Sequence, residues 1–204
     1  NGISCDLEQG ILKVEFVTPD VVRVQYTGEN TFMGNGTDVC LPRAVDNLVR
    51  WVYTPNPDCY LLKSDSLIVR VDLSTASITY LDEEGGLLLQ EDQNIPRISE
   101  KRVTKQVIYD EHSKHIEKTA DGDKEIKNVL RYDTIGHTWK YRINFKWQPL
   151  EALYGWGSHM EDYMNLRGKE LYLCQHNLKA MVSVLNSTAG YGLLFDAGCA
   201  MMFK

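Results

Sequence analysis

The residues of this sequence that could act chemically are a few histidines, acids and one serine. Gly157-Ser158-His159 places a serine next to a histidine, as a nucleophile and its base would require. A serine hydrolase of the α/β type needs Gly-x-Ser-x-Gly on a turn from a strand into a helix. The second glycine and the helix are missing here, and neighbouring residues on an extended chain point to opposite faces. The segment therefore predicts an irregular loop.

His112 and His115 form a His-x-x-His pair beside Glu111. A helix would bring both imidazoles to one face, but the surrounding segment is polar and predicts no helix. A zinc site also needs a third ligand, and the sequence does not place one. We expect solvated loop histidines, no bound metal ion and no cofactor.

Acids near the C-terminal end raise the question of glycoside hydrolysis, which uses two carboxyl groups about 5–9.5 Å apart. Glu161-Asp162 and Asp196 lie in a stretch rich in glycine and aromatic residues. Trp156, between two glycines of that stretch, could stack on the apolar face of a sugar ring. Nothing in the spacing of the acids brings two of them face to face, so the residues alone predict no catalytic site.

The composition is ordinary for a globular protein, with 43% hydrophobic and 25% charged residues in a chain of 204. The formal net charge of −6 argues against a nucleic-acid partner. No apolar run approaches the ~20 residues that span a bilayer.

Apolar and polar residues alternate with a period of two along most of the chain. Leu12, Val14 and Phe16 alternate with charged residues, and a Pro-Asp turn leads into a second alternating run, which predicts a β-hairpin with one buried face. Further strands are expected over residues 67–73, 78–80 and 87–89, and a loop over residues 28–47. Helical periodicity is absent. These signals predict an all-β fold, an antiparallel β-sandwich in a single domain over residues 1–204.

The strongest alternation places five large residues on one face of a strand: Trp139, Tyr141, Ile143, Phe145 and Trp147. Side chains of the aromatic type bury about 150–250 Å² each. We therefore expect this strand at the centre of a core.

Three motifs rich in glycine and aromatic residues follow one another within about 45 residues near the C-terminal end. They read Tyr154-Gly155-Trp156-Gly157-Ser158, Asn165-Leu166-Arg167-Gly168 and Ser187-Thr188-Ala189-Gly190-Tyr191-Gly192-Leu193-Leu194-Phe195-Asp196. In content and order they resemble the end of the N-terminal domain of glycoside hydrolase family 31, the α-glucosidase and α-xylosidase family. Ser158 departs from the glutamate that is usual there.

The resemblance implies a β-sandwich of the galactose-mutarotase-like type that packs against a catalytic (β/α)8 barrel. In that family two aspartates of the barrel perform a retaining double displacement, one as nucleophile and the other as general acid/base. A barrel needs about 250 residues, and the nucleophile motif of the family does not occur in this sequence. We expect the barrel downstream and no catalytic residue within residues 1–204.

The resemblance also implies one contribution to the substrate site. In related enzymes a loop between the Gly-Arg segment and the closing hairpin contacts the sugar, and by order this loop is Cys174-Gln175-His176-Asn177-Leu178. Asn177 falls near the position of a substrate-contacting aspartate, and an amide keeps the acceptor role of a carboxylate. We therefore predict Asn177, His176 and, by stacking, Trp156 as substrate-binding residues.

The predicted function is that of a non-catalytic N-terminal domain of a retaining α-glycosidase, whose parent chain hydrolyses α-linked glucosides or xylosides. The expected partners are the parent's own catalytic barrel and an oligosaccharide or glycoside substrate, without nucleic acid or membrane insertion. A periplasmic or secreted location is expected.

Two alternatives stay open. The first is a stand-alone carbohydrate-binding module that uses Trp156 and Tyr191 as stacking platforms. The second is an aldose epimerase-like enzyme, which needs a histidine acid and a carboxylate base that converge on the sugar.

Overall fold

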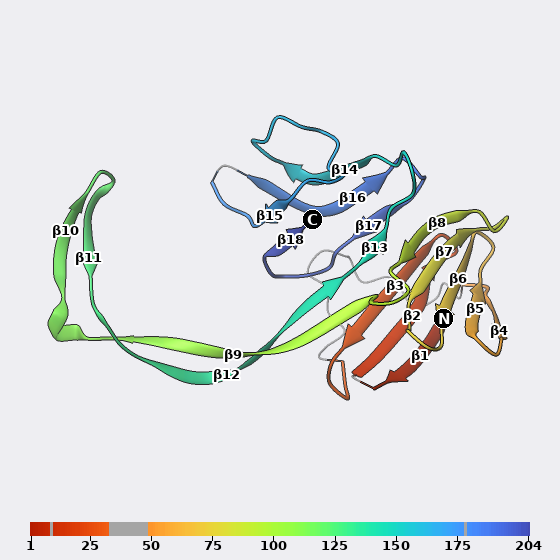
Figure 1. The fold of residues 1–204 in the computed structure, drawn as a ribbon, viewed down its shortest axis with the longest axis horizontal. Coiled ribbons are helices and arrows are strands. Elements are labelled where there is room, and N and C mark those ends of the chain that lie inside the picture. The colour runs from red at the N-terminus through yellow and green to blue at the C-terminus, as the bar shows by residue number, and fades with distance from the viewer. Residues whose placement is uncertain (9, 33–48, 178) are drawn as a thin grey trace. The chain divides into compact units, whose positions relative to one another are not determined.

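The computed structural model describes residues 1–8, 10–32, 49–177 and 179–204, which are mostly β-strand (Figure 1). The chain divides into two compact units. We call residues Asn1–Pro96 with Ile143–Lys204 the sandwich unit, and Arg97–Arg142 the ribbon unit. The predicted all-β fold is confirmed. Most of the loop expected over residues 28–47 lies outside the described residues, and the single domain over residues 1–204 stays a prediction.

Two antiparallel sheets of the sandwich unit share one core. The first has the strand order β1-β2-β3, and the second has the order β13-β8-β7-β6-β5-β4. The strands are β1 (Gly2–Leu7), β2 (Gly10–Thr18), β3 (Val21–Thr27), β4 (Val52–Pro55), β5 (Cys59–Lys63), β6 (Leu67–Asp72), β7 (Ile78–Asp82), β8 (Leu87–Glu91) and β13 (Phe145–Lys146).

The core between these sheets follows from the alternation in the sequence. Leu12, Val14 and Phe16 of β2 pack in one cluster with buried residues of the six-stranded sheet, among them Leu62 and Val69. All five are at most 2% exposed. Two sheets whose inner faces share a core form a β-sandwich, so the predicted antiparallel sandwich is confirmed, as is the hairpin of β2 and β3.

A second core lies near the C-terminal end of the sandwich unit. One sheet has the order β14-β16-β17 and a second pairs β15 with β18. The strands are β14 (Leu153–Ser158), β15 (Leu171–Leu173), β16 (Ala180–Ser187), β17 (Gly192–Leu194) and β18 (Met201–Phe203). The buried side chains of this core are Leu153, Trp156, Leu166, Leu171, Leu173 and Leu185. The described residues contain no helix long and apolar enough to cross a membrane.

The ribbon unit consists of two separate two-stranded sheets (Figure 1). The 13-residue β9 (Arg97–Tyr109) pairs with the 15-residue β12 (Val129–Ile143), whose last residue already belongs to the sandwich unit. β10 (His115–Thr119) pairs with β11 (Gly122–Ile126), and the 3-10 turn η1 (Glu111–Ser113) precedes β10. No residue from Arg97 to Arg142 is buried.

The prediction that the aromatic strand lies at the centre of a core is wrong. None of its five large residues is buried, and Tyr141 and Ile143 are 46% and 42% exposed. Within the described residues β12 pairs only with β9. Trp139 is covered partly by its own strand neighbour Tyr141, with ring centroids 6.3 Å apart. The predicted strand is also divided, since β12 ends at Ile143, Phe145 lies in β13 beside β8, and Trp147 follows β13 and packs against the second core. Alternation therefore predicted extended chain here, but neither one continuous strand nor its environment.

The first core provides a direct test of the sandwich. We expect Leu62→Ala to lower the free energy of unfolding by about 2–5 kcal/mol, because the fully buried side chain leaves a cavity between packed sheets. Leu150→Ala is the matched control, since Leu150 is 99% exposed and its loss should change stability by less than about 0.5 kcal/mol. Urea denaturation measures both. Equal effects of the two substitutions would contradict the assignment of this core.

Candidate functional site

A hollow of about 570 Å³ lies where the end of β14 meets the start of β16. The described residues that line it are Ser158, Gln175, His176, Asn177, Lys179 and Ala180. The loop predicted to contact substrate thus borders a hollow, and His176 and Asn177 are exposed there. Leu178, the last residue of the predicted loop, lies outside the described residues.

The side chain of Gln175 holds this loop in place from within. Its Nε2 donates to the carbonyl oxygen of Lys179 at 2.8 Å, and its Oε1 accepts from the backbone nitrogen of Met181 at 2.9 Å. The backbone nitrogen of Lys179 donates to the carbonyl oxygen of His176 at 3.1 Å. One amide therefore bridges both sides of the turn that presents His176 and Asn177.

An ion pair ties the loop to the segment after β14. Lys179 Nζ lies 2.6 Å from Glu161 Oε1, and the two side chains are 18% and 31% exposed. The hydrogen bond from Lys179 holds the pKa of the Glu161 carboxyl below its ordinary value. His159, 9% exposed, has its Nδ1 at 3.9 Å from the second Glu161 oxygen. That oxygen and both His159 ring nitrogens are buried without a hydrogen-bond partner among the described residues.

Trp156 belongs to the packing of the second core. Its side chain is 2% exposed, and its ring centroid lies 5.3 Å from that of Phe195 and 5.8 Å from that of Phe203. A sugar ring cannot stack on a face that other aromatic rings cover. In this conformation the predicted stacking role of Trp156 has no accessible surface, and the residue instead supports the corner from which Ser158 reaches the hollow.

The glycines beside Trp156 make that corner possible. Gly155, Trp156 and Gly157 all have positive φ, at 136°, 62° and 90°. A Cβ on Gly157 would overlap the carbonyl oxygen of Ala180 on β16, because the two strands approach closely there. The Gly-Trp-Gly motif is thus explained by backbone geometry.

A buried carboxylate connects the third motif to the chain before β14. Glu151, 4% exposed, accepts hydrogen bonds at Oε1 from the hydroxyls of Ser187 and Tyr191, and at Oε2 from the backbone nitrogen of Gln148 at 2.6 Å. Burial and then the hydrogen bond to Glu151 raise the pKa of Tyr191 well above its ordinary value. The tyrosine therefore stays protonated and donates to the carboxylate.

The Asn-Leu-Arg-Gly motif joins the same network from the other side. Arg167 Nη1 donates to the carbonyl oxygens of Gln148 at 2.6 Å and Glu151 at 2.8 Å. Asn165 Oδ1 accepts from the backbone nitrogens of Leu153 and Arg167, each at 3.1 Å. Sequence reasoning missed Glu151, because a lone acid before a strand predicts a surface position. Its place directly before the first motif was the available signal.

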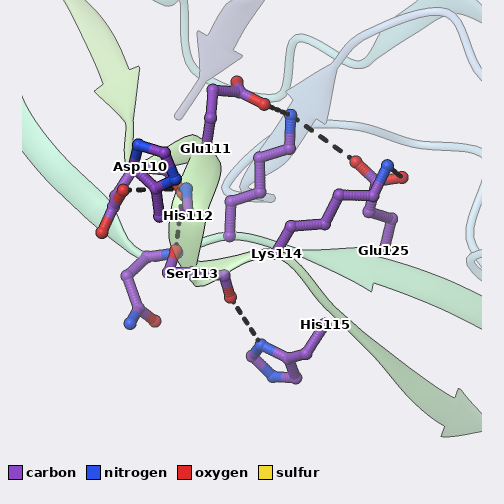
Figure 2. Close-up of polar contacts among 9 residues, drawn as sticks. Asp110, Glu111, His112, Ser113, Lys114, His115 and Glu125 are labelled. Atoms are coloured by element: carbon purple, nitrogen blue, oxygen red, sulfur yellow. Dashed lines mark hydrogen bonds and ion pairs between the residues drawn. The ribbon is translucent and has the colours of Figure 1, made fainter.

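The His-x-x-His pair lies in the ribbon unit, at the turn between β9 and β10. Figure 2 shows the rings of His112 and His115 pointing away from each other, and both residues are exposed. The backbone nitrogen of His112 donates to Asp110 Oδ1, and His115 Nδ1 lies 3.0 Å from the Ser113 carbonyl oxygen. Among the described residues no group of three or more His, Cys, Asp or Glu side chains is placed to hold a metal ion.

The chain forms an all-β domain of antiparallel sheets. In it the buried carboxylate of Glu151 links the closing hairpin to the chain before β14. The sequence profile described as the glycosyl hydrolase 31 N-terminal galactose mutarotase-like domain matches residues 11–203. The chain belongs to this family, as the three motifs indicated.

Known relatives agree with this assignment. An uncharacterized family 31 glucosidase from Pseudescherichia vulneris is 34% identical over 61 residues, which are 30% of this chain and 12% of the glucosidase. A GH31 α-xylosidase from Xanthomonas citri has a TM-score of 0.70 at 19% identity and 99% coverage of this chain. A GH31 dextranase from Flavobacterium johnsoniae has a TM-score of 0.66 at 13% identity and full coverage. The present chain spans only 19% and 23% of these two enzymes, and at such identities the likeness concerns the fold.

The hydroxyl of Tyr191 offers a test of the Glu151 network. We expect Tyr191→Phe to destabilise the protein by about 1–3 kcal/mol, because a buried carboxylate oxygen loses a donor. Since the pKa of Tyr191 is higher in the folded than in the unfolded state, the wild type should also lose stability as the pH rises above about 10, where only the unfolded state releases this proton.

Urea denaturation at pH 7 and at pH 10.5 measures both effects. Tyr172→Phe is the control, because Tyr172 is 55% exposed and should change neither value. The prediction would be wrong if the Tyr191→Phe variant were as stable as the wild type and lost the same stability at high pH. The Tyr191 hydroxyl would then not stabilise Glu151.

Proposed function

We propose that this chain is the non-catalytic N-terminal domain of a retaining α-glycosidase and that it shapes the entrance of the substrate pocket. Membership of the glycosyl hydrolase 31 N-terminal family supports the first part. The observation that carries the second part is the braced loop, which presents the exposed His176 and Asn177 at a hollow of about 570 Å³.

The chemistry of the hollow favours binding over cleavage. Retaining hydrolysis uses two carboxyl groups about 5–5.5 Å apart, and none of the described lining residues is an acid. Glu161 is not among the lining residues and is paired with Lys179. The cleaving carboxylates therefore belong, in this proposal, to a catalytic barrel elsewhere in the parent chain.

The lining offers groups that suit a sugar. The Asn177 amide donates and accepts, a His176 ring nitrogen can do either, and Ser158 adds a hydroxyl. Such groups match the paired donors and acceptors of glycoside hydroxyls. We infer an α-linked glucoside or xyloside as the occupant, with Asn177 and His176 in direct contact and Trp156 acting through the corner that it packs.

The outer side of the β14-β16-β17 sheet supports the proposed packing on a barrel. Tyr154, Val182 and Leu194 are 39%, 53% and 48% exposed, whereas Leu153 and Leu185 on the same strands are buried. Clustered exposed apolar side chains on a sheet are typical of a surface that another layer covers. The parent's catalytic barrel is the partner that we propose for it.

The two alternatives fit the geometry less well. Stacking platforms at Trp156 and Tyr191 would suit a free-standing module, but the first is 2% exposed and the second donates to Glu151. An epimerase needs an accessible histidine and carboxylate. His159 and Glu161 are close to each other, but the histidine is 9% exposed and the carboxylate is paired with Lys179.

The reading frame downstream of Lys204 tests the proposed parent. Several hundred further residues with a barrel pattern and the nucleophile motif would support it, whereas a stop codon within a few residues would favour the free-standing module. The periplasmic or secreted location stays a prediction, and fractionation of the native host would check it.

Within the full-length enzyme, Asn177→Ala tests the substrate contact. We expect kcat/KM to fall about tenfold, since a hydroxyl of the bound sugar would be left without its partner. His176→Ala should have a smaller effect, and Asn30→Ala, at an exposed asparagine outside the loop, should have none. Steady-state kinetics on an aryl α-glycoside measure all three. An unchanged kcat/KM for Asn177→Ala would show that Asn177 does not contact the substrate.

Glu161→Gln tests whether the ion pair positions the loop. We expect KM to rise about threefold or more with little change in kcat, because Lys179 loses its charged partner and the loop loses its brace. The same substitution in the Asn177→Ala background should have almost no further effect, as a double-mutant cycle would show for coupled residues. Additive losses would instead indicate a general destabilisation.

A further inference from the structure

A buried histidine lies directly after β14 without a hydrogen-bond partner among the described residues. The side chain of His159 is 9% exposed, and both of its ring nitrogens are buried and unpartnered there. The Oε2 oxygen of Glu161 is buried and unpartnered in the same way. Buried polar groups that make no hydrogen bond lower stability and are few in native proteins. Two that lie side by side are therefore candidates for a contact that forms only in one protonation state.

The distance between these two groups fits neither a hydrogen bond nor a bridging water. His159 Nδ1 lies 3.9 Å from Glu161 Oε2, whereas an N–H···O hydrogen bond measures about 2.7–3.2 Å. A single water between them would need two bonds of about 2.8 Å, which together span roughly 4.5 Å at the angle of a water molecule. A shift of about 1 Å would instead bring the nitrogen and the oxygen into direct contact.

Glu161 has one oxygen left for this contact because Lys179 uses the other. Lys179 Nζ lies 2.6 Å from Glu161 Oε1. The backbone of Lys179 in turn closes the loop, since its nitrogen donates to the carbonyl oxygen of His176 at 3.1 Å and its carbonyl oxygen accepts from Gln175 Nε2 at 2.8 Å. A contact from His159 would thus fix the carboxylate that holds the end of the loop, without displacing Lys179.

The proton on His159 is the variable that changes the charge of this cluster near neutral pH. The charged groups that face it are Glu161 on its own segment and, across the carboxylate, Lys179 directly before β16. The hydrogen bond from Lys179 holds the pKa of Glu161 below its ordinary value, so the carboxylate stays ionised at pH 5.5. Imidazoles change their charge between about pH 5 and 8. His176 is the other imidazole at this loop, so the effect of each must be measured separately.

We propose that protonated His159 closes onto Glu161 and thereby stabilises the loop that presents His176 and Asn177. Nδ1 of the imidazolium would donate to Oε2, and a charge-assisted hydrogen bond of this kind is about twice as strong as a neutral one. The proton comes from solvent and returns to it, and no other covalent bond forms or breaks. The neutral ring corresponds to the open contact of 3.9 Å. This proposal concerns the conformation of the loop and does not depend on what the hollow binds.

Hydrogen exchange of the 204-residue chain at pH 5.5 and pH 7.5, followed by NMR, tests the proposal. The reporters are the backbone amides of Lys179 and Met181, which donate to acceptors within the loop. After correction for the intrinsic exchange rate, we expect their protection factors to be about threefold or more higher at pH 5.5, because a loop that is held opens less often. The amide of Asn56, which donates to the Cys59 carbonyl oxygen between β4 and β5, should not change.

Three substitutions identify the side chain that causes the effect. His159→Phe keeps a ring of similar size without a donor, so the loop should show the lower protection at both pH values. His159→Asn places an amide donor near the position of Nδ1 without a titrating proton. Its protection should be independent of pH and lie above that of His159→Phe. His176→Gln is the matched control, because it removes the other imidazole of the loop and should leave the pH difference intact.

A titration of the wild type needs no substitution and therefore does not depend on how well the variants fold. The nitrogen-15 chemical shift of His159 Nδ1 reports the charge of the ring. We expect the protection of the Lys179 amide to follow this charge with the same midpoint, since the closed contact forms only with the protonated ring.

Loop protection that is equal at the two pH values, or lower at pH 5.5, would overturn the proposal. A pH difference that persists in His159→Phe would overturn it as well. Loss of the pH difference in His176→Gln would do the same, because the effect would then belong to the other imidazole.

Discussion

The hydrogen bonding of the buried Glu151 is the constraint on which the C-terminal half of the sandwich unit depends. A carboxylate at 4% exposure is costly unless its oxygens are paired. Ser187 and Tyr191 come from the closing hairpin, and the backbone nitrogen of Gln148 comes from the chain before β14. Arg167 then binds the carbonyl oxygens of the same segment. The carboxylate thus ties the third motif, and Arg167 the second, to the chain just before β14.

The candidate site depends on these hydrogen bonds of Glu151 and Arg167. The network holds the start of β14 against the end of β16, and the Gly-Trp-Gly corner continues β14 toward Ser158. From there the chain leads to Glu161, whose ion pair with Lys179 holds the loop of His176 and Asn177. The exposed polar tip is therefore supported by buried packing and by hydrogen bonds at its base, which is what a loop needs to present side chains in a defined geometry.

The two units of the chain differ in how far they bury the side chains of alternating strands. In the sandwich unit, alternating strands face each other across a core, so residues such as Leu12 and Val69 reach full burial. In the ribbon unit, strands of similar pattern pair only with each other among the described residues, and residues such as Tyr132 and Ile135 stay about 60% exposed. The hydrophobic effect acts on area removed from water, so the ribbon contributes little to stability without a further surface.

Sequence alone determined the class of fold and the family. Period-two alternation specifies strands because successive side chains leave a strand on opposite faces, and the three motifs rich in glycine and aromatic residues indicated the family. Tertiary structure alone decided three things: that Trp156 packs inside, that Glu151 is buried, and that no residue of the strand that holds Trp139 is buried. Burial depends on which layers meet across the chain, and local alternation carries no information about a partner layer.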